Sequence, residues 1–240
     1  PGLKSLLERL DKEKSRFDGG LEIRAIQAIY DRFSEQRCIN GFIEELLNRI
    51  DKNTFYADLA DIIVLLGEMM IKPLIHEVMV EDKKLSYLGS FAIFLRRRAL
   101  GEVLAMMVKK NGYETISENL KDILQGSNPT AVKNAVDLIM YVQDPALMGL
   151  LSVVIAYPDP EVRKKVVLVL SKFPTSANLQ LLNKMLNDTD VGVQLNVINL
   201  LGKVGDRSSL DLLKNLKNTE HQKAVKAATD FLENRGGKVK

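Results

Sequence analysis

Cysteine and histidine are almost missing from this chain of 240 residues, which contains one cysteine and two histidines. A single cysteine excludes internal disulfides and cysteine-based zinc sites, and it suits a reducing compartment. We interpret Cys38 as a small buried residue, because the sequence places no base beside it that would make it a nucleophile. His76 and Glu77 begin like a helical zinc-protease motif, but Val80 stands where the second histidine would have to be. These shortages predict no metal, no cofactor and no catalytic residue.

Phosphate-binding glycine loops, tryptophan and long apolar runs are missing as well. Gly19-Gly20 lacks the spaced glycines and the Lys-Ser/Thr pair of a nucleotide site. The longest uncharged apolar run, 147–157, is about half as long as a transmembrane helix, and no charged-then-apolar leader opens the chain. We therefore expect a cytoplasmic protein without membrane insertion. Because the chain begins with proline inside a helical pattern, we also expect it to be a piece of a longer, bacterial protein.

Aliphatic residues supply the core instead. Apolar residues make up 46% of the chain and charged residues 27%, whereas aromatic residues make up 6%. This composition is that of a folded protein, and it suits closely packed helices better than a sheet. The net charge is +3, and residues 127–240 carry 15 basic against 11 acidic groups. So mild an excess permits a polyanionic partner without requiring one.

Apolar residues recur every 31 residues in the second half of the chain. The pairs Leu150-Leu151, Leu181-Leu182 and Leu212-Leu213 mark the apolar face of the first helix in successive units. The second helix repeats with the same step, in columns that reach back to residue 100: Leu100, Ala131, Val162, Val193 and Ala224; Leu104, Ala135, Val166, Val197 and Ala228; Val108, Ile139, Leu170, Leu201 and Leu232. Several columns in one phase indicate a repeated supersecondary unit.

Helix-capping residues separate these apolar faces. Asn128-Pro129, Asp159-Pro160 and Asp190 stand one period apart, each just before a second helix. An Asn or Asp side chain can accept hydrogen bonds from the free amides of the first turn, and proline at the next position loses none. Each unit is thus a pair of helices that cannot close a core alone and must stack on its neighbours. The predicted fold is all-α, a right-handed α-solenoid of about seven antiparallel helix pairs with about 31 residues per repeat.

The units resemble HEAT repeats, in particular the short bacterial and phycobilisome-lyase-like type, whose second helices often begin with Asp-Pro-x-x-Arg. Residues 159–163, Asp-Pro-Glu-Val-Arg, match that motif, and Val204-Gly205-Asp206 resembles the usual turn between units. Gln194 stands where the family tends to place arginine, so the resemblance implies an incomplete ladder of charges between repeats. The resemblance also implies a scaffold or binding module; a lyase or a HEAT-like DNA glycosylase is the enzymatic alternative, which fold likeness alone does not carry.

The regular repeats extend over 83–240. Upstream, helical periodicity persists near 20–34, 38–51, 54–66 and 69–80, but the apolar columns lose phase. We therefore interpret 1–82 as divergent repeats of the same array, with a separate helical cap as the alternative. Arg96-Arg97-Arg98 falls at a predicted junction between two helices, where we expect the arginines to pair with the carboxyl end of a helix.

Second helices line the concave side in solenoids of the HEAT type, so the resemblance places the binding surface on their outward positions. These positions form a polar, lysine-rich candidate face: Lys133, Asn134, Asp137, Tyr141, Lys164, Lys165, Leu168, Lys172, Asn196, Asn199, Lys203 and Lys226. A protein partner would use the apolar members as anchors and the lysines as contacts for acidic side chains.

Nucleic acid is the competing partner, because lysines at repeat spacing could follow a phosphate backbone. Asp137 and Asp230 interrupt the positive strip, and aromatic residues that could stack on bases are scarce. We therefore predict a non-catalytic scaffold that presents this face to a protein partner, with phosphate-backbone binding as the alternative.

Overall fold

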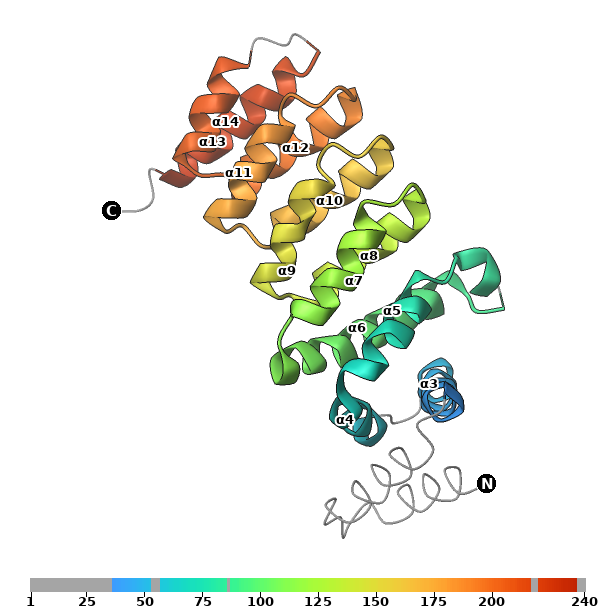
Figure 1. Cartoon of the computed structure of the whole chain (residues 1–240). Helices are drawn as coiled ribbons and strands as arrows, with labels where there is room; N and C mark the ends of the chain where they lie inside the picture. Colours follow the sequence, from blue (N-terminus) through green and yellow to red (C-terminus); the bar gives the residue numbers. More distant parts are fainter. Residues whose placement is uncertain (1–35, 53–56, 86, 217–219, 237–240) are drawn as a thin grey trace. The chain divides into compact units, whose positions relative to one another are not determined.

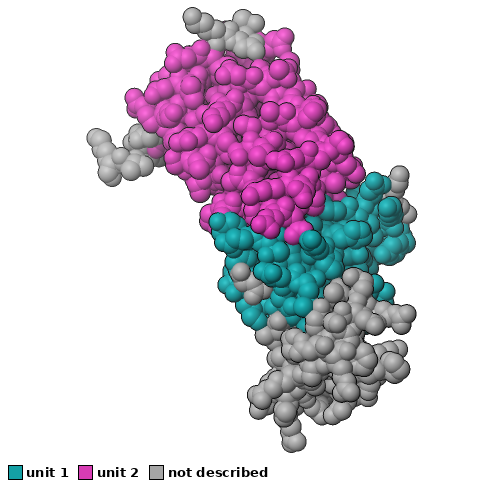
Figure 2. All heavy atoms as spheres, viewed as in Figure 1, with its two compact units in different colours: residues 1–116 teal, residues 117–240 magenta. Residues whose placement is uncertain are grey.

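The computed structural model describes residues 36–52, 57–85, 87–216 and 220–236. Over these ranges the chain is helix or loop, without a strand. The residues divide into two compact units, 1–116 and 117–240, which Figure 2 shows in different colours. The proposed change from divergent to regular repeats at residue 82 remains a prediction.

Unit 1 is built around one long helix. Its elements are α3 (Gln36–Asp51), α4 (Ala57–Leu66), the 3-10 helix η1 (Gly67–Met70), α5 (Ile71–Met79), the 3-10 helix η2 (Asp82–Leu85) and α6 (Ser90–Asn111). The 22 residues of α6 pack against α3, α4 and α5, and Leu100, Leu104 and Met107 are fully buried there. The helices expected near 38–51, 54–66 and 69–80 correspond to α3, α4 and η1 with α5. The segment near 20–34 and the side chain of Cys38 lie outside the described residues.

The three consecutive arginines lie inside α6, so the predicted helix junction at this point is wrong. The helix continues because the stretch contains no glycine or proline between Ser90 and Leu100 to interrupt it. Arg97 nevertheless meets the carboxyl end of a helix, since its guanidinium donates to the carbonyl oxygens of Val78 and Val80 at the end of α5. The expected role is therefore seen, although the partner helix comes from an earlier segment.

Unit 2 is a stack of helix pairs. It contains the later part of α7 (Glu114–Leu124), followed by α8 (Pro129–Val142), α9 (Pro145–Gly149), the 3-10 helix η3 (Leu150–Val153), α10 (Pro160–Lys172), α11 (Ser176–Met185), α12 (Val191–Val204), α13 (Arg207–Asn215) and α14 (Gln222–Gly236). The second helices α8, α10, α12 and α14 contact one another in that order, and α11 contacts both α9 and α13 in the row of first helices (Figure 1). Unit 2 is therefore an α-solenoid of antiparallel pairs, as the 31-residue period predicts.

The predicted caps begin these helices. Asn128 accepts hydrogen bonds from the amides of Thr130 and Ala131 at the start of α8, and Asp190 accepts one from Val193 at the start of α12. Asp159 does the same for Glu161 at the start of α10. The period of 31 is thus also the spacing between successive capped helix starts.

Two of the three predicted second-helix columns are buried throughout, whereas Ala131 and Ala224 of the column that begins at Leu100 are half-buried. On the first helices Leu151, Leu182 and Leu213 have no exposed surface, whereas Leu150 and Leu181 are half-buried and Leu212 is 42% exposed, so the predicted apolar face is buried only in part. The column from Leu104 to Ala228 is buried throughout, and its last member is 5% exposed. No helix in the described ranges combines the length and the hydropathy needed to cross a membrane.

Candidate functional site

The outward side chains of α8, α10, α12 and α14 lie on the candidate face. We call this surface the second-helix face and define it by Lys133, Asp137, Tyr141, Lys164, Lys165, Leu168, Lys172, Asn196, Asn199, Lys203 and Lys226. Six of them, Leu168, Lys172, Asn196, Asn199, Lys203 and Lys226, are exposed, and the others are half-buried.

Asn134 does not belong to this surface, and the expectation that it points outward is wrong. Its side chain is 5% exposed, and its Nδ2 is buried without a hydrogen-bond partner. Its place on α8 explains the burial. Asn134 stands four residues before the buried Leu138 and eight before the buried Val142, so it lies on the same side of the helix as these two residues. At the equivalent positions of α10 and α12, Lys165 is half-buried and Asn196 is exposed.

Lysines on the second-helix face pair with the aspartates that cap neighbouring helices. Lys133 Nζ lies 3.8 Å from Asp159 Oδ2, and one period later Lys164 Nζ lies 4.0 Å from Asp190 Oδ1. Lys164 also forms a 2.7 Å contact with Glu161 Oε1, and the hydrogen bond to Glu161 raises the pKa of Lys164. Each of these lysines thus connects one second helix to the start of the next.

A further pair runs in the opposite direction along the array. Lys165 Nζ of α10 lies 2.8 Å from Asp137 Oδ2 of α8. Lys172 instead points its Nζ at Met140 Sδ, at 3.2 Å. Lys203 and Lys226, like Lys172, have no ion-pair partner within the described residues, so the unpaired positive charge on the face lies on α10, α12 and α14.

Leu168 is an exposed apolar side chain in the middle of these charges. It is 44% exposed, while Val167 and Leu170 beside it on α10 are fully buried. One helical turn away on either side stand Lys164 and Lys172. Along α10, this apolar side chain therefore stands between two lysines.

Arg163 holds the repeats together beneath this face. Its Nε and Nη2 donate to the two carboxylate oxygens of Asp188, each at 2.7 Å, and its Nη1 donates to the carbonyls of Tyr157 and Pro158. In the next repeat, Gln194 Nε2 donates to the backbone carbonyl of Asp188. The charge ladder is therefore incomplete at Gln194, as the resemblance implied, and Arg163 serves the framework because its side chain is buried.

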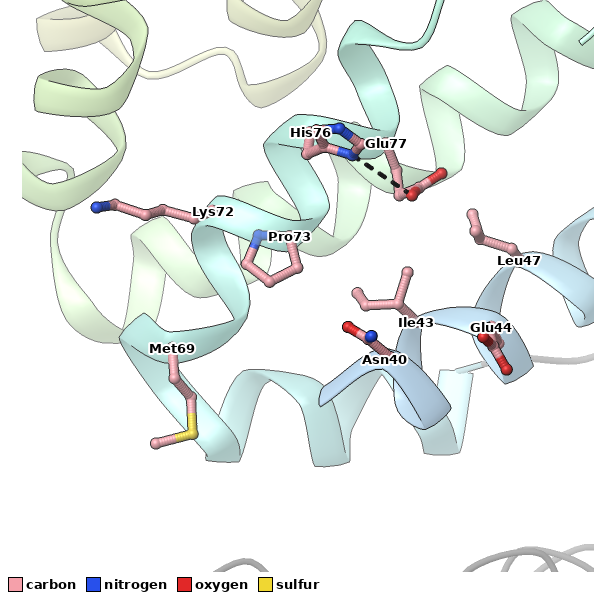
Figure 3. A pocket seen from close by; sticks show the side chains of 9 residues that line it. All are labelled: Asn40, Ile43, Glu44, Leu47, Met69, Lys72, Pro73, His76 and Glu77. Carbon is pink, nitrogen blue, oxygen red and sulfur yellow. Dashed lines mark ion pairs between the residues drawn. The ribbon is translucent and has the colours of Figure 1, made fainter. Parts of the chain in front are cut away.

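A cavity of about 590 Å³ in unit 1 lies between one side of α3 and one side of η1 and α5 (Figure 3). Ile43, Leu47 and Pro73 line it together with charged side chains. His76 Nδ1 lies 3.6 Å from Glu77 Oε1, but His76 is 79% exposed and Glu77 also accepts a hydrogen bond from Arg96. Within the described residues no three His, Cys, Asp or Glu side chains gather as a metal site would require.

A second cavity, of about 500 Å³, lies in unit 2 on the row of first helices, between α9 with η3 and α11. The sequence pattern did not lead us to predict this cavity. The available signal was a size difference at equivalent positions, because Gly149 and Ser152 stand one period before Gln180 and Asn183. Small side chains on one of two neighbouring helices leave a groove between them.

The second half of the chain resembles a known repeat family. A family profile for HEAT repeats matches residues 117–193 and 147–233. A designed armadillo repeat protein is 17% identical to this chain, with 78% of this chain and 99% of the designed protein covered and a TM-score of 0.36. The structure of another engineered protein is 16% identical, with 78% and 96% covered and a TM-score of 0.36. No curated protein sequence matches the chain.

Proposed function

We propose that this chain, whose residues 117–233 belong to the HEAT-repeat family, is a non-catalytic module that holds a protein partner on its second-helix face. Repeats of the HEAT and armadillo type commonly mediate protein binding. The cytoplasm is the compartment that we assign to it, since one cysteine in 240 residues suits reducing conditions.

The exposure of Leu168 carries this proposal. A large aliphatic side chain that is 44% exposed at the centre of a row of helices supplies the apolar anchor around which an interface can exclude water. Lys164 and Lys172 stand one helical turn before and after it on α10, which places polar side chains beside the apolar one, as in the rim of a protein interface.

The ion pairs favour a protein over a nucleic acid. Backbone binding depends on lysines that neutralise phosphates and release counterions. Lys133, Lys164 and Lys165 already contact carboxylates of this chain, so a phosphate would have to displace those partners. A mixed surface of matched charges with an apolar centre suits a protein partner of mixed character.

Two leucines of almost equal exposure allow a matched test. Leu168 is 44% exposed on the second helix α10, and Leu212 is 42% exposed on the first helix α13. Wild type, Leu168→Asp and Leu212→Asp would each be immobilised and used to capture proteins from an extract of the source organism. We expect Leu168→Asp to lose a partner that wild type and Leu212→Asp retain, because the charge would be desolvated in the interface. Equal capture by all three proteins would contradict the second-helix face as the binding surface.

Nucleic acid is tested separately with a fluorescent 20-base-pair DNA duplex in a polarisation titration. Binding that weakens steeply between about 50 and 200 mM salt, and weakens further in Lys203→Glu, would favour the alternative function. We expect no salt-dependent binding of this kind. Lys203 is the appropriate position because its side chain is exposed and the substitution breaks no ion pair within the described residues.

A further inference from the structure

The groove between the first helices α9 and α11 has an apolar floor and two facing stripes of side chains. Met148 of α9 is 4% exposed at the floor, with Leu181 of α11 opposite in the lining. Pro145, Gly149 and Ser152 extend along the α9 side at helical spacing, and Ala177 and Lys184 extend along the α11 side. This surface belongs to the row of first helices, so it is separate from the second-helix face.

The groove is open because two polar side chains turn to their own backbone. One repeat later, Ser209 Oγ donates to Asn183 Oδ1 at 3.0 Å and connects α13 to α11. At the equivalent positions here, Ser152 Oγ donates to Gly149 O and Asn178 Nδ2 donates to Phe173 O. Gly149 adds to the opening, since a Cβ built on it meets no heavy atom within 4 Å.

The length of the groove limits what can fill it. From Pro145 to Ser152 the helical rise is roughly 10 Å, at about 1.5 Å per residue. An extended peptide rises about 3.3 Å per residue, so a segment of roughly three residues spans that distance. The volume of about 500 Å³ is within the range of sites that enclose small ligands.

The charge of the groove selects the sign of its ligand. Among the lining residues, all within the described part of the chain, Lys184 is the one charged side chain. Lys184 is exposed and has no ion-pair partner in the described ranges, in contrast to Lys133, Lys164 and Lys165. An apolar floor with an unmatched cation at one end complements an apolar segment that carries a carboxylate.

We propose that the α9–α11 groove is a second binding site, which takes a short extended segment of a partner protein with two apolar residues followed by an acidic one. The apolar side chains enter over Met148 and Leu181, and the carboxylate pairs with Lys184. The site stands independently of the second-helix face, so a partner that occupied both would be held at two points of unit 2 and would gain in avidity.

The probe is a defined peptide, acetyl-Gly-Leu-Leu-Glu-Gly-amide, titrated into the ¹⁵N-labelled full chain and followed by NMR. We expect chemical shift changes at the amides of Gly149, Ser152, Ala177 and Lys184. A peptide with Lys in place of Glu, and one with Ser in place of both Leu, should bind more weakly. Changes confined to other residues, or none at millimolar peptide, would overturn the proposal.

Two substitutions test the site itself. Gly149→Leu should abolish these shifts by filling the groove, and it should leave the helical circular dichroism unchanged because the position is open and its φ of −59° is helical. Lys184→Glu should lower the affinity for the peptide that contains Glu about fivefold, since an exposed ion pair is modest in strength. It should raise the affinity for the peptide that has Lys in place of Glu. Lys203→Glu, the same change on the second-helix face, is the control and should leave the affinity unchanged. Peptide binding that survives both groove substitutions would refute the site, whatever Leu168→Asp does to partner capture.

Discussion

Arg163 and Asp188 form a buried two-point ion pair across consecutive repeats, with both nitrogen-to-oxygen distances at 2.7 Å. Arg163 comes from the second helix α10, and Asp188 comes from the turn before the next second helix α12. The side chains are 9% and 5% exposed. The planar guanidinium matches both carboxylate oxygens at once, which gives the contact its directional specificity. The pair therefore fixes the turn of one repeat onto the helix of the repeat before it.

Breaking this pair should strongly destabilise unit 2. We expect Arg163→Met to lower the free energy of unfolding by about 3–5 kcal/mol, because Asp188 would be left as a buried, unpaired charge. Arg207→Met is the matched control: Arg207 is 87% exposed beside Asp211, and its loss should change stability by less than about 0.5 kcal/mol. Urea denaturation followed by circular dichroism measures both, and similar midpoints for the two variants would contradict this role of Arg163.

The same pair should make stability depend on acid pH. Burial alone would raise the pKa of Asp188, but hydrogen bonds from Arg163 and the amide of Asp190, with the charge of Arg163, bring it below its ordinary value of 3.8. A lowered carboxyl pKa stabilises the folded state above the unfolded pKa, and this stabilisation is lost as pH falls through the folded pKa. Wild type should therefore be more stable than Asp188→Asn at pH 7, and the difference should shrink below about pH 4. Urea midpoints of both proteins between pH 7 and 3 test this, and a constant difference would argue against the linkage.

Gly202 should be intolerant of any side chain. A Cβ built on it would lie 2.8 Å from Ala228 Cβ and 2.9 Å from Ala228 Cα, where α12 packs against α14. We expect Gly202→Ala to destabilise the protein by about 1–3 kcal/mol, because the two helices must move apart. Gly149→Ala should instead be neutral or stabilising by up to about 1 kcal/mol, since alanine is the better helix former and the position is open. Thermal unfolding of both variants compares the two sites. Equal losses of stability in Gly202→Ala and Gly149→Ala would contradict the explanation by helix spacing.

Neighbouring arginines in α6 should differ in their contribution to unit 1. Arg97 donates to the carbonyls of Val78 and Val80, whereas Arg98 is 57% exposed and pairs with Glu102 on the same helix. Arg97→Met should lower the free energy of unfolding by about 1.5–3 kcal/mol, because charged hydrogen bonds to the end of α5 are lost. Arg98→Met should lower it by about 0.3–0.5 kcal/mol, which is typical of losing an ion pair on a helix surface. Native-state hydrogen exchange in α5 would show the difference, and equal protection in both variants would contradict it.

Short-range sequence features were sufficient to predict that unit 2 is a stack of helix pairs. The apolar columns and the caps Asn128, Asp159 and Asp190 depend on contacts within a few residues, which helical periodicity and side-chain length largely dictate. The period of 31 residues then implied stacking, because no single pair can bury both of its apolar sides. These features could be predicted without coordinates.

Interactions between helices could not be predicted in the same way. The sequence pattern does not reveal that Arg163 meets Asp188, which stands 25 residues later, or that Lys165 reaches back to Asp137. The pattern also predicted that Asn134 points outward from α8, although it is buried. How much of a helix surface is buried depends on the helices that pack beside it. The period shows which positions are equivalent, but it does not show whether their environments are equal.

Repetition along the chain thus accounts for the helices, their starts and their shared core, because each of these arises from short-range geometry repeated every 31 residues. The partners of the lysines, the pairing of Arg163 with Asp188 and the burial of Asn134 arise only when the helices pack. They depend on distances of a few ångströms between side chains from different helices, and a one-dimensional pattern carries no information about those distances.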